Sequence, residues 1–257
     1  ALPIFGNNSS GQTSVRDAYV TYTGSTYTNL WLWMGDNAYS SGTDAEYQSN
    51  VFDIYEDVMK YMPLYPSPGN HDYANVGYQG ASALTTNFPY YTNFTVPTAA
   101  EAGGVASGTE KYYSYNYANI HFISLDSYGA LNNSSSAMYT WLNSDLAANT
   151  QDWTIAYFHH PPYTKGSHNN DTETELLDIR GNIIPLLESY HVDLVLCGHS
   201  HANERSYMLK GHYGTSSTFN SSTMVLGSGS GKMPSPYTKT SPYNGTVYVV
   251  CGTGGQL

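Results

Sequence analysis

Short runs of apolar residues recur along this chain, bounded by glycine, proline or small polar residues. Their length suits a buried strand, whereas a helix usually needs about ten residues or more. The runs predict strands over residues 29–34, 111–126 (as a hairpin), 153–158, 192–197, 205–211, 222–226 and 246–250.

Between these runs lie segments whose apolar residues repeat at helical spacing. They predict helices over residues 12–22, 43–62, 136–147 and 173–190. The second helix begins with a capping box, Thr43 with Glu46, and Pro63 and Pro66 follow its end. Strands that alternate with helices and are followed by further strands predict an α/β fold, with helices layered around mixed sheets. No linker or repeat divides the chain, so we expect a single domain over residues 1–257.

The composition narrows the class of protein. The 257 residues carry a formal net charge of -11, which argues against a nucleic-acid-binding surface, because such surfaces collect lysine and arginine. No apolar run approaches the ~20 residues that span a bilayer, so no membrane segment is expected. Lysine and arginine together number 9, while uncharged polar residues abound, which favours a secreted or periplasmic protein.

The two cysteines, Cys197 and Cys251, each end a predicted strand. If these strands are neighbours, the pair could form a disulfide, but two buried free thiols fit the pattern equally well. The cysteines therefore do not fix the redox compartment.

Metal-compatible side chains follow several of the predicted elements. They are Asp36 and Tyr39 after the strand at 29–34, Asn70 and His71 in the turn at 68–72, His159 after the strand at 153–158, and His199 and His201 after the strand at 192–197. Each alone has an ordinary explanation as a cap, a turn residue or a packed histidine. Together they indicate a metal centre at one sheet edge, and the mixture of oxygen and nitrogen donors suits iron, manganese or zinc.

The same residues form recognisable sequence blocks. These are Gly35-Asp36-Asn37-Ala38-Tyr39, Gly69-Asn70-His71-Asp72, His159-His160-Pro161-Pro162-Tyr163, and Gly198-His199-Ser200-His201 with Glu204-Arg205. In this order they resemble the calcineurin-type metallophosphoesterases, and the tyrosine three residues after the aspartate resembles their purple acid phosphatase branch. The resemblance implies a four-layer α/β/β/α sandwich of two mixed sheets flanked by helices, with two metal ions at the sheet edge.

The resemblance also implies a role for each matched residue. Asp36 would bridge the two metals; Tyr39 and His201 would bind the first, and Asn70, His159 and His199 the second. The expected pair is iron together with zinc, manganese or a second iron. His71 would contact the substrate with Asp72 orienting it, and His168, nine residues after His159, would protonate the leaving alkoxide.

Two features depart from the family pattern. Relatives carry an aspartate after the opening strand, whereas here residues 1–5 are followed by Gly6-Asn7-Asn8. Either Asn7 substitutes or a ligand is missing, so the first metal site is expected to be weak or empty. Relatives also continue beyond the strand at 246–250, so we expect a domain trimmed at both ends.

These observations predict a metal-dependent phosphatase that hydrolyses a small phosphorylated substrate, with a metal-bound hydroxide attacking a phosphomonoester. A phosphodiesterase or nucleotidase on the same site is one alternative. A non-catalytic secreted binding or structural protein with a degraded metal site is another. Residues 73–110, which lack periodicity, are expected to form a loop insertion over the site. The sequence leaves the oligomeric state open.

Overall fold

The computed structural model describes residues 6–78, 83–227, 229 and 236–255, so the opening strand expected at 1–5 lies outside the described residues. The strands are β1 (Trp31–Met34), β2 (Leu64–Ser67), β3 (Tyr113–Tyr117), β4 (Ile120–Ser124), β5 (Trp153–Phe158), β6 (Leu194–Cys197), β7 (Asn203–Leu209), β8 (Val225–Leu226) and β9 (Thr246–Cys251). The α-helices are α1 (Ser10–Thr23), α2 (Asp44–Tyr47), α3 (Asp53–Met59), α4 (Pro89–Asn93), α5 (Ala137–Ala148), α6 (Thr174–Asp178), α7 (Ile184–Ser189) and α8 (Ser221–Met224).

The described strands form two sheets. The larger has seven strands in the order β3-β4-β5-β6-β9-β7-β8, and the smaller pairs β1 with β2. Strands β4, β5, β6 and β9 run parallel to their neighbours in that series, while β3 and β7 pair antiparallel. Strands β1 and β2 are parallel, and α2 and α3 lie in the crossover that connects them. In the described residues the larger sheet is therefore mixed and the smaller one is a parallel pair.

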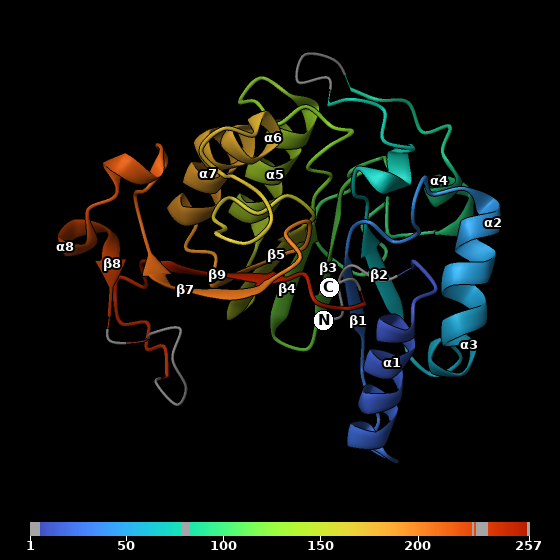
Figure 1. Ribbon diagram of the computed structural model, residues 1–257. Coiled ribbons are helices and arrows are strands. Elements are labelled where there is room, and N and C mark those ends of the chain that lie inside the picture. Colours follow the sequence, from blue (N-terminus) through green and yellow to red (C-terminus); the bar gives the residue numbers. More distant parts are fainter. Residues whose placement is uncertain (1–5, 79–82, 228, 230–235, 256–257) are drawn as a thin grey trace.

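Strand β1 shows how the layers stack. Its side chains alternate between two faces, and all four are buried. Trp31 and Trp33 pack with the aromatic residues of α2 and α3, whereas Leu32 and Met34 pack with Tyr157 and its neighbours on the larger sheet. The smaller sheet therefore lies between helices and the larger sheet, as Figure 1 shows.

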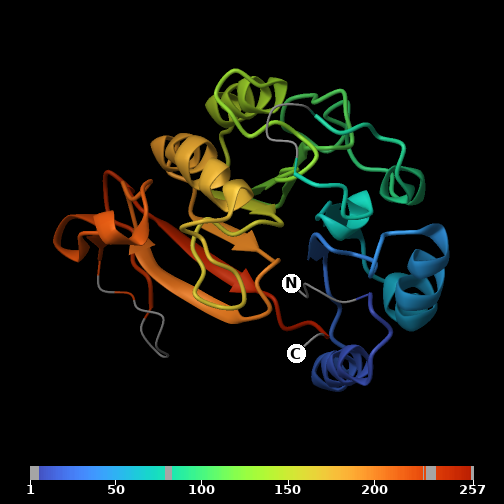
Figure 2. The same cartoon turned by 45° about the horizontal axis from the view of Figure 1, so that its top comes forward.

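The other face of the larger sheet is covered by α5, α6 and α7 (Figures 1 and 2). Ala156 and Phe158 of β5 join one apolar cluster with Leu142 of α5 and Leu187 of α7. Three apolar clusters thus separate four layers, and the expected α/β/β/α sandwich is confirmed.

Most of the predicted elements occur, with four differences. Strand β2 was not expected, and the segment at 222–226 is largely helix α8, with only two residues in β8. Each of the predicted helices at 43–62 and 173–190 contains a π-helical segment, Gln48–Phe52 and Ile179–Ile183 respectively. The loop at 73–110 contains helix α4.

Both cysteines are free thiols, which decides between the two alternatives. Strands β6 and β9 are neighbours, but Cys197 pairs with Val250 in the register. Cys251 is one residue further along, so its side chain points to the opposite face of the sheet. In the part of the chain that the structure describes, no helix has the length and apolar character needed to cross a membrane.

Candidate metal centre

Four strands deliver polar side chains to one edge of the sandwich. Asp36 follows β1, Asn70 follows β2, His159 follows β5 and His199 follows β6. Strands β1 and β2 are parallel neighbours, as are β5 and β6, so their carboxyl ends lie together at the same edge. The structure thus brings together the four strand-end groups that the sequence singled out.

Three of the four side chains converge on a nitrogen atom of the fourth, Nε2 of His159. Asp36 Oδ2 lies 3.0 Å from it, Asn70 Oδ1 3.2 Å and His199 Nδ1 3.1 Å. The other ring nitrogen, Nδ1, lies 2.8 Å from the carbonyl oxygen of Met34, which only accepts. Nδ1 therefore carries a hydrogen atom, and Nε2 faces the three other donor atoms.

Such a cluster of lone pairs is stable only around a cation. Burial opposes the charged form of His159, but the adjacent Asp36 raises its pKa overall. Burial also opposes ionisation of Asp36, yet His159 and then His71 lower the pKa of this carboxyl far below its usual range. In the metal-free protein a proton balances the carboxylate, and a metal ion with oxygen and nitrogen ligands fits the same position.

The backbone around this cluster is specialised for close approach. Asp36 and His199 have positive φ values, 53° and 62°, which cost conformational energy in non-glycine residues. A Cβ atom at Gly69 would lie 2.4 Å from Asp36 Oδ1, and one at Gly35 would lie 2.6 Å from His159 Nδ1. The glycines of the sequence blocks are therefore required by packing.

Tyr39 contacts Asp36, and His201 lies within electrostatic reach of it. The Tyr39 hydroxyl donates a hydrogen bond of 2.9 Å to Asp36 Oδ2. Burial lowers the pKa of His201 while the Asp36 carboxylate opposes that shift, so the imidazole lies within electrostatic reach of Asp36. Together the three residues offer one carboxylate, one phenol and one imidazole.

Asn7 does not complete this set. Its Oδ1 accepts a hydrogen bond of 3.1 Å from the backbone N–H of Ser9, in the turn before α1, where Ser9 is the N-cap. The neighbouring Gly6 does reach the site, because its carbonyl oxygen accepts a bond of 2.7 Å from the N–H of Tyr39. The amide of Asn7 is used in the turn that starts the helix, which is what asparagine commonly does there.

His71 lies between Asp36 and solvent, with its side chain 24% exposed. Its backbone N–H donates to Asp36 Oδ1 at 3.0 Å, and its Nδ1 lies 2.6 Å from the carbonyl oxygen of Ser40. The Ser40 carbonyl therefore places the hydrogen on Nδ1 and leaves Nε2, 4.0 Å from Asp36 Oδ2, on the side of the metal cluster.

The expectation that Asp72 orients His71 is wrong. Asp72 is buried and accepts hydrogen bonds from Gly69 N at 2.8 Å, from Asn37 Nδ2 at 3.0 Å and from the Tyr47 hydroxyl at 2.6 Å. Burial, together with the Asp36 charge, raises its pKa to about 6. Asp72 ties together the loops that carry Asp36 and Asn70, and the Ser40 carbonyl holds His71.

The ring of His168 packs against that of a candidate ligand, His199. Its ring centroid lies 3.7 Å from that of His199, and its Nδ1 lies 2.8 Å from Glu173 Oε2. Glu173 Oε1 accepts a hydrogen bond of 2.6 Å from the N–H of Asn169, and Oε2 is 3.6 Å from His199 Nε2. In the sequence Glu173 marks only the start of a predicted helix. An acid five residues after a candidate proton donor was the available signal.

A second missed residue is His160. It is fully buried beside His159 and His199, with ring centroids 4.7 and 4.4 Å away. In the sequence block it occupied a position to which no role was attached.

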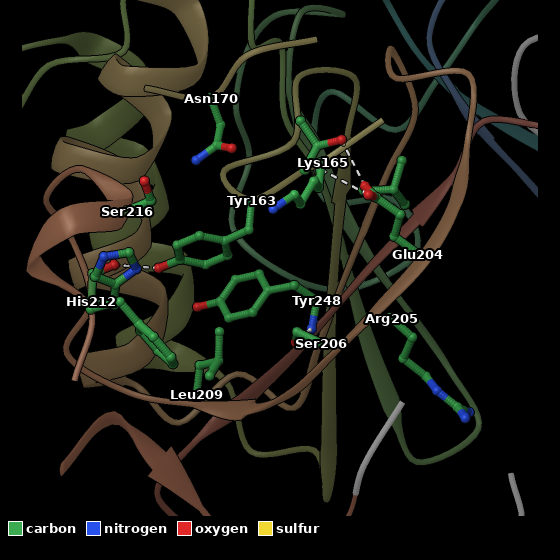
Figure 3. Close-up of a pocket in the computed structure, with 13 residues that line it drawn as sticks. Tyr163, Lys165, Asn170, Glu204, Arg205, Ser206, Leu209, His212, Ser216 and Tyr248 are labelled. Atoms are coloured by element: carbon green, nitrogen blue, oxygen red, sulfur yellow. Dashed lines mark hydrogen bonds between the residues drawn. The ribbon is translucent and has the colours of Figure 1, made fainter. Parts of the chain in front are cut away.

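A cavity of about 330 Å³ is lined in part by Lys165 and Asn170, from the segment that follows Tyr163 (Figure 3). The rings of Tyr163 and Tyr248 lie at its centre and Leu209 at its base, while Arg205 points away from them. Glu204 accepts a bond of 2.8 Å from the N–H of Lys165, which fixes the loop. A smaller cavity of about 250 Å³, lined by His168, shares the residues Thr164, Lys165, Asn170 and Ser216 with it.

Comparison with known proteins identifies related sequences. A model of the calcineurin-like phosphoesterase family matches residues 21–203. An uncharacterized protein of Mycobacterium tuberculosis is 29% identical over 229 residues, which cover 80% of this chain and 38% of that protein. Purple acid phosphatase 23 of Arabidopsis thaliana is 33% identical over 154 residues, covering 58% of this chain and 31% of that protein. The chain spans about a third of the length of these relatives.

Solved structures share the fold. The purple acid phosphatase PPD1 from seeds of yellow lupin (Lupinus luteus) superposes with a TM-score of 0.61 at 18% identity, over 98% of this chain and 40% of that chain. GAP50, the anchor in the inner membrane complex of Plasmodium, superposes with a TM-score of 0.57 at 14% identity, over 98% of this chain and 70% of that chain.

Proposed function

This chain belongs to the calcineurin-like phosphoesterase family, and we propose that it hydrolyses phosphomonoesters at a centre that holds two metal ions. The family supports a phosphoric ester hydrolase, and the matches to purple acid phosphatases support that branch. We propose further that residues 1–257 form one such domain, which the apolar cluster shared by the two sheets supports.

The convergence of Asp36, Asn70 and His199 on Nε2 of His159 carries this proposal. These residues would hold the second metal, with Asp36 shared between the two. Tyr39 and His201 would hold the first. We propose iron together with zinc, manganese or a second iron as the pair. Bound cations at this position would supply Lewis acidity towards the phosphoryl group and make a water molecule more acidic.

Two histidines would act on the substrate. In His71 and His168 the Nδ1 atom is held by an oxygen acceptor, Ser40 O at 2.6 Å and Glu173 Oε2 at 2.8 Å. Each ring therefore presents Nε2 for a bond to the substrate. We assign to His71 a hydrogen bond to a phosphoryl oxygen, and to His168 the transfer of a proton from Nε2 to the departing alkoxide.

The cavity of Figure 3 supports a place for the alcohol part of the substrate, because it shares walls with the cavity that His168 lines. Its aromatic wall would accept a ring or an alkyl group in preference to a charged one. The scarcity of lysine and arginine, 9 in 257 residues, supports the further proposal that the protein acts outside the cytoplasm. Fractionation of the native host tests this location: we expect the protein outside the cytoplasm, and recovery in the cytoplasmic fraction would contradict the proposal.

A non-catalytic binding protein is the rival that a specific observation favours. The side chain of Asn7 is engaged with Ser9, so the described residues offer the first metal only Asp36, Tyr39 and His201. Such a protein would bind metal and phosphate without turnover.

Hydrolysis assays on metal-stripped and metal-restored protein separate these readings. We expect restored protein to hydrolyse p-nitrophenyl phosphate and to leave bis(p-nitrophenyl) phosphate nearly untouched. Preferential cleavage of the diester would favour a phosphodiesterase or nucleotidase. Full metal content without turnover of either ester would favour the non-catalytic rival.

A further inference from the structure

His160 is a buried imidazole with one unused nitrogen. Its side chain is fully buried, and Nε2 has no hydrogen-bond partner among the residues that the structure describes. Buried polar atoms are nearly always paired, and an unpaired one needs an explanation. The nearest rings are those of His159 and His199, both candidate ligands of the second metal.

The contacts at the other ring nitrogen indicate the state of Nε2. Ser127 Oγ accepts a hydrogen bond of 3.0 Å from the backbone N–H of His160 and lies 2.8 Å from its Nδ1. If this oxygen also accepts from Nδ1, the hydrogen of the neutral ring is on Nδ1 and Nε2 presents a lone pair. If the hydroxyl donates instead, Nε2 carries a hydrogen with no acceptor. Only the first arrangement becomes fully satisfied when a cation lies beside Nε2.

The geometry allows one cation to reach all three histidines. One ligand atom each from His159, His160 and His199 lie within 4.8 Å of one another, and all three side chains are buried. A metal ligand must be a neutral imidazole with a free lone pair, and the contact of Nδ1 with Ser127 leaves Nε2 available for that role. A ring hydrogen bonded to Ser127 is the support that ligating histidines usually have.

We propose that His160 is a third imidazole ligand of the second metal, and that this chain binds zinc there through His159, His160 and His199. The proposal rests on the proposed function only for the position of that metal. A third imidazole increases the nitrogen content of the donor set, and among the metals considered above this favours zinc over manganese and ferrous iron.

Zinc binding by His160 variants tests the proposal. One equivalent of zinc is added to metal-stripped protein, and the dissociation constant is measured by competition with a chromophoric chelator. H160A should weaken binding at least ~100-fold, beyond the roughly 10–100-fold that loss of a hydrogen-bonded support costs. S127A, which removes only that support, should fall within the 10–100-fold range. X-ray absorption should count three imidazoles per zinc in the wild type and two in H160A.

Matched controls separate a direct role from a packing role. His212 is also buried but lies outside the histidine cluster, so H212A should leave zinc affinity unchanged. H160Q keeps most of the side-chain volume and serves if H160A does not fold, which thermal unfolding of the metal-free proteins reports. Equal zinc affinity in wild type, H160A and H160Q, with two imidazoles per zinc, would overturn the role of His160 and leave the proposed metal centre intact. A wild type that binds no zinc would overturn this inference, and a wild type that binds no metal at all would overturn the centre as well.

Discussion

Replacing Glu173 by glutamine tests how the imidazole of His168 is held. Glu173 Oε2 lies 2.8 Å from His168 Nδ1, and Oε1 accepts a hydrogen bond of 2.6 Å from the N–H of Asn169. Glutamine keeps the length of the side chain but has only one acceptor oxygen, so one of the two bonds must be lost. E173Q should therefore leave Nδ1 of His168 less well held and reduce proton transfer from Nε2.

The size of the effect follows from the exposure of the pair. A hydrogen bond to a charged group contributes about 1.5–3 kcal/mol. The side chains of His168 and Glu173 are 30% and 29% exposed, so solvent screening places the loss near the lower end, about 1.5 kcal/mol. This corresponds to a decrease of about tenfold in kcat for a substrate whose leaving group needs protonation.

The assay measures kcat for two substrates in four proteins. The kcat values for an alkyl phosphate and for p-nitrophenyl phosphate are compared in wild type, E173Q, H168A and the double variant. E173Q should slow the alkyl ester about tenfold and p-nitrophenyl phosphate much less, while H168A should slow the alkyl ester roughly 10²–10⁴-fold. In the H168A background the second change should add little, because the group that Glu173 holds is already absent.

Metal content is the control for this assay. Glu173 Oε2 lies 3.6 Å from His199 Nε2, which is beyond a hydrogen bond, so E173Q should retain the metal. Equal losses of kcat on both esters, or a further tenfold loss in the H168A background, would refute proton transfer through His168.

Three other substitutions test separate contacts. Tyr39→Phe removes the phenol next to Asp36 Oδ2. A phenolate bound to Fe(III) gives a visible charge-transfer band, so if iron fills the first site the wild type should be coloured and the folded variant colourless; a coloured variant would assign the band to another group. Asn7→Asp should leave the metal content measured by elemental analysis unchanged, because Asn7 Oδ1 bonds to Ser9 N; a rise in metal content would show that residue 7 reaches the site. Asp72→Asn should lower the free energy of unfolding in urea by about 3 kcal/mol, because an amide nitrogen must then face a donor such as Gly69 N or Asn37 Nδ2; a change below about 1 kcal/mol would contradict the role of Asp72 as the tie between the loops.

The apolar runs predicted most of the strands of an α/β fold because these strands are largely buried, and the resemblance to a known family predicted the four-layer sandwich. Strand β5 was predicted with the bounds that the structure has, Trp153–Phe158. The sequence does not predict strand β2, because Pro66 is also typical of a helix terminator. In the described residues β2 pairs only with β1, and a strand with one free edge tolerates proline.

Asp36, His159 and His199 could be predicted as candidate ligands because each closely follows a predicted strand, where chain geometry fixes their position, whereas Asn70 was recognised only from its turn and its sequence block. The contacts of the residues adjacent to these ligands could not be predicted, because neighbouring side chains in a turn point in different directions. Asp72 follows His71 in a 3-10 turn yet is buried under the loops, and His160, next to His159, has its Nδ1 atom against Ser127.

Contacts between residues of the same loop could not be predicted from the sequence either. Glu173 meets His168 only because the segment between them folds back on itself, which no spacing rule specifies. Asn7 illustrates the opposite error: its alignment with a missing ligand was suggestive, but a local bond to Ser9 ahead of α1 competes for the same oxygen.

The most direct test of the account is to measure metal content and phosphatase activity together in His199→Ala. His199 Nδ1 lies 3.1 Å from His159 Nε2, at the centre of the donor cluster, and no other role is assigned to it. We predict that the folded variant, restored with metal beside the wild type, lacks the second metal and hydrolyses p-nitrophenyl phosphate at background rate. A folded variant with wild-type metal stoichiometry and activity would contradict the assignment of this centre.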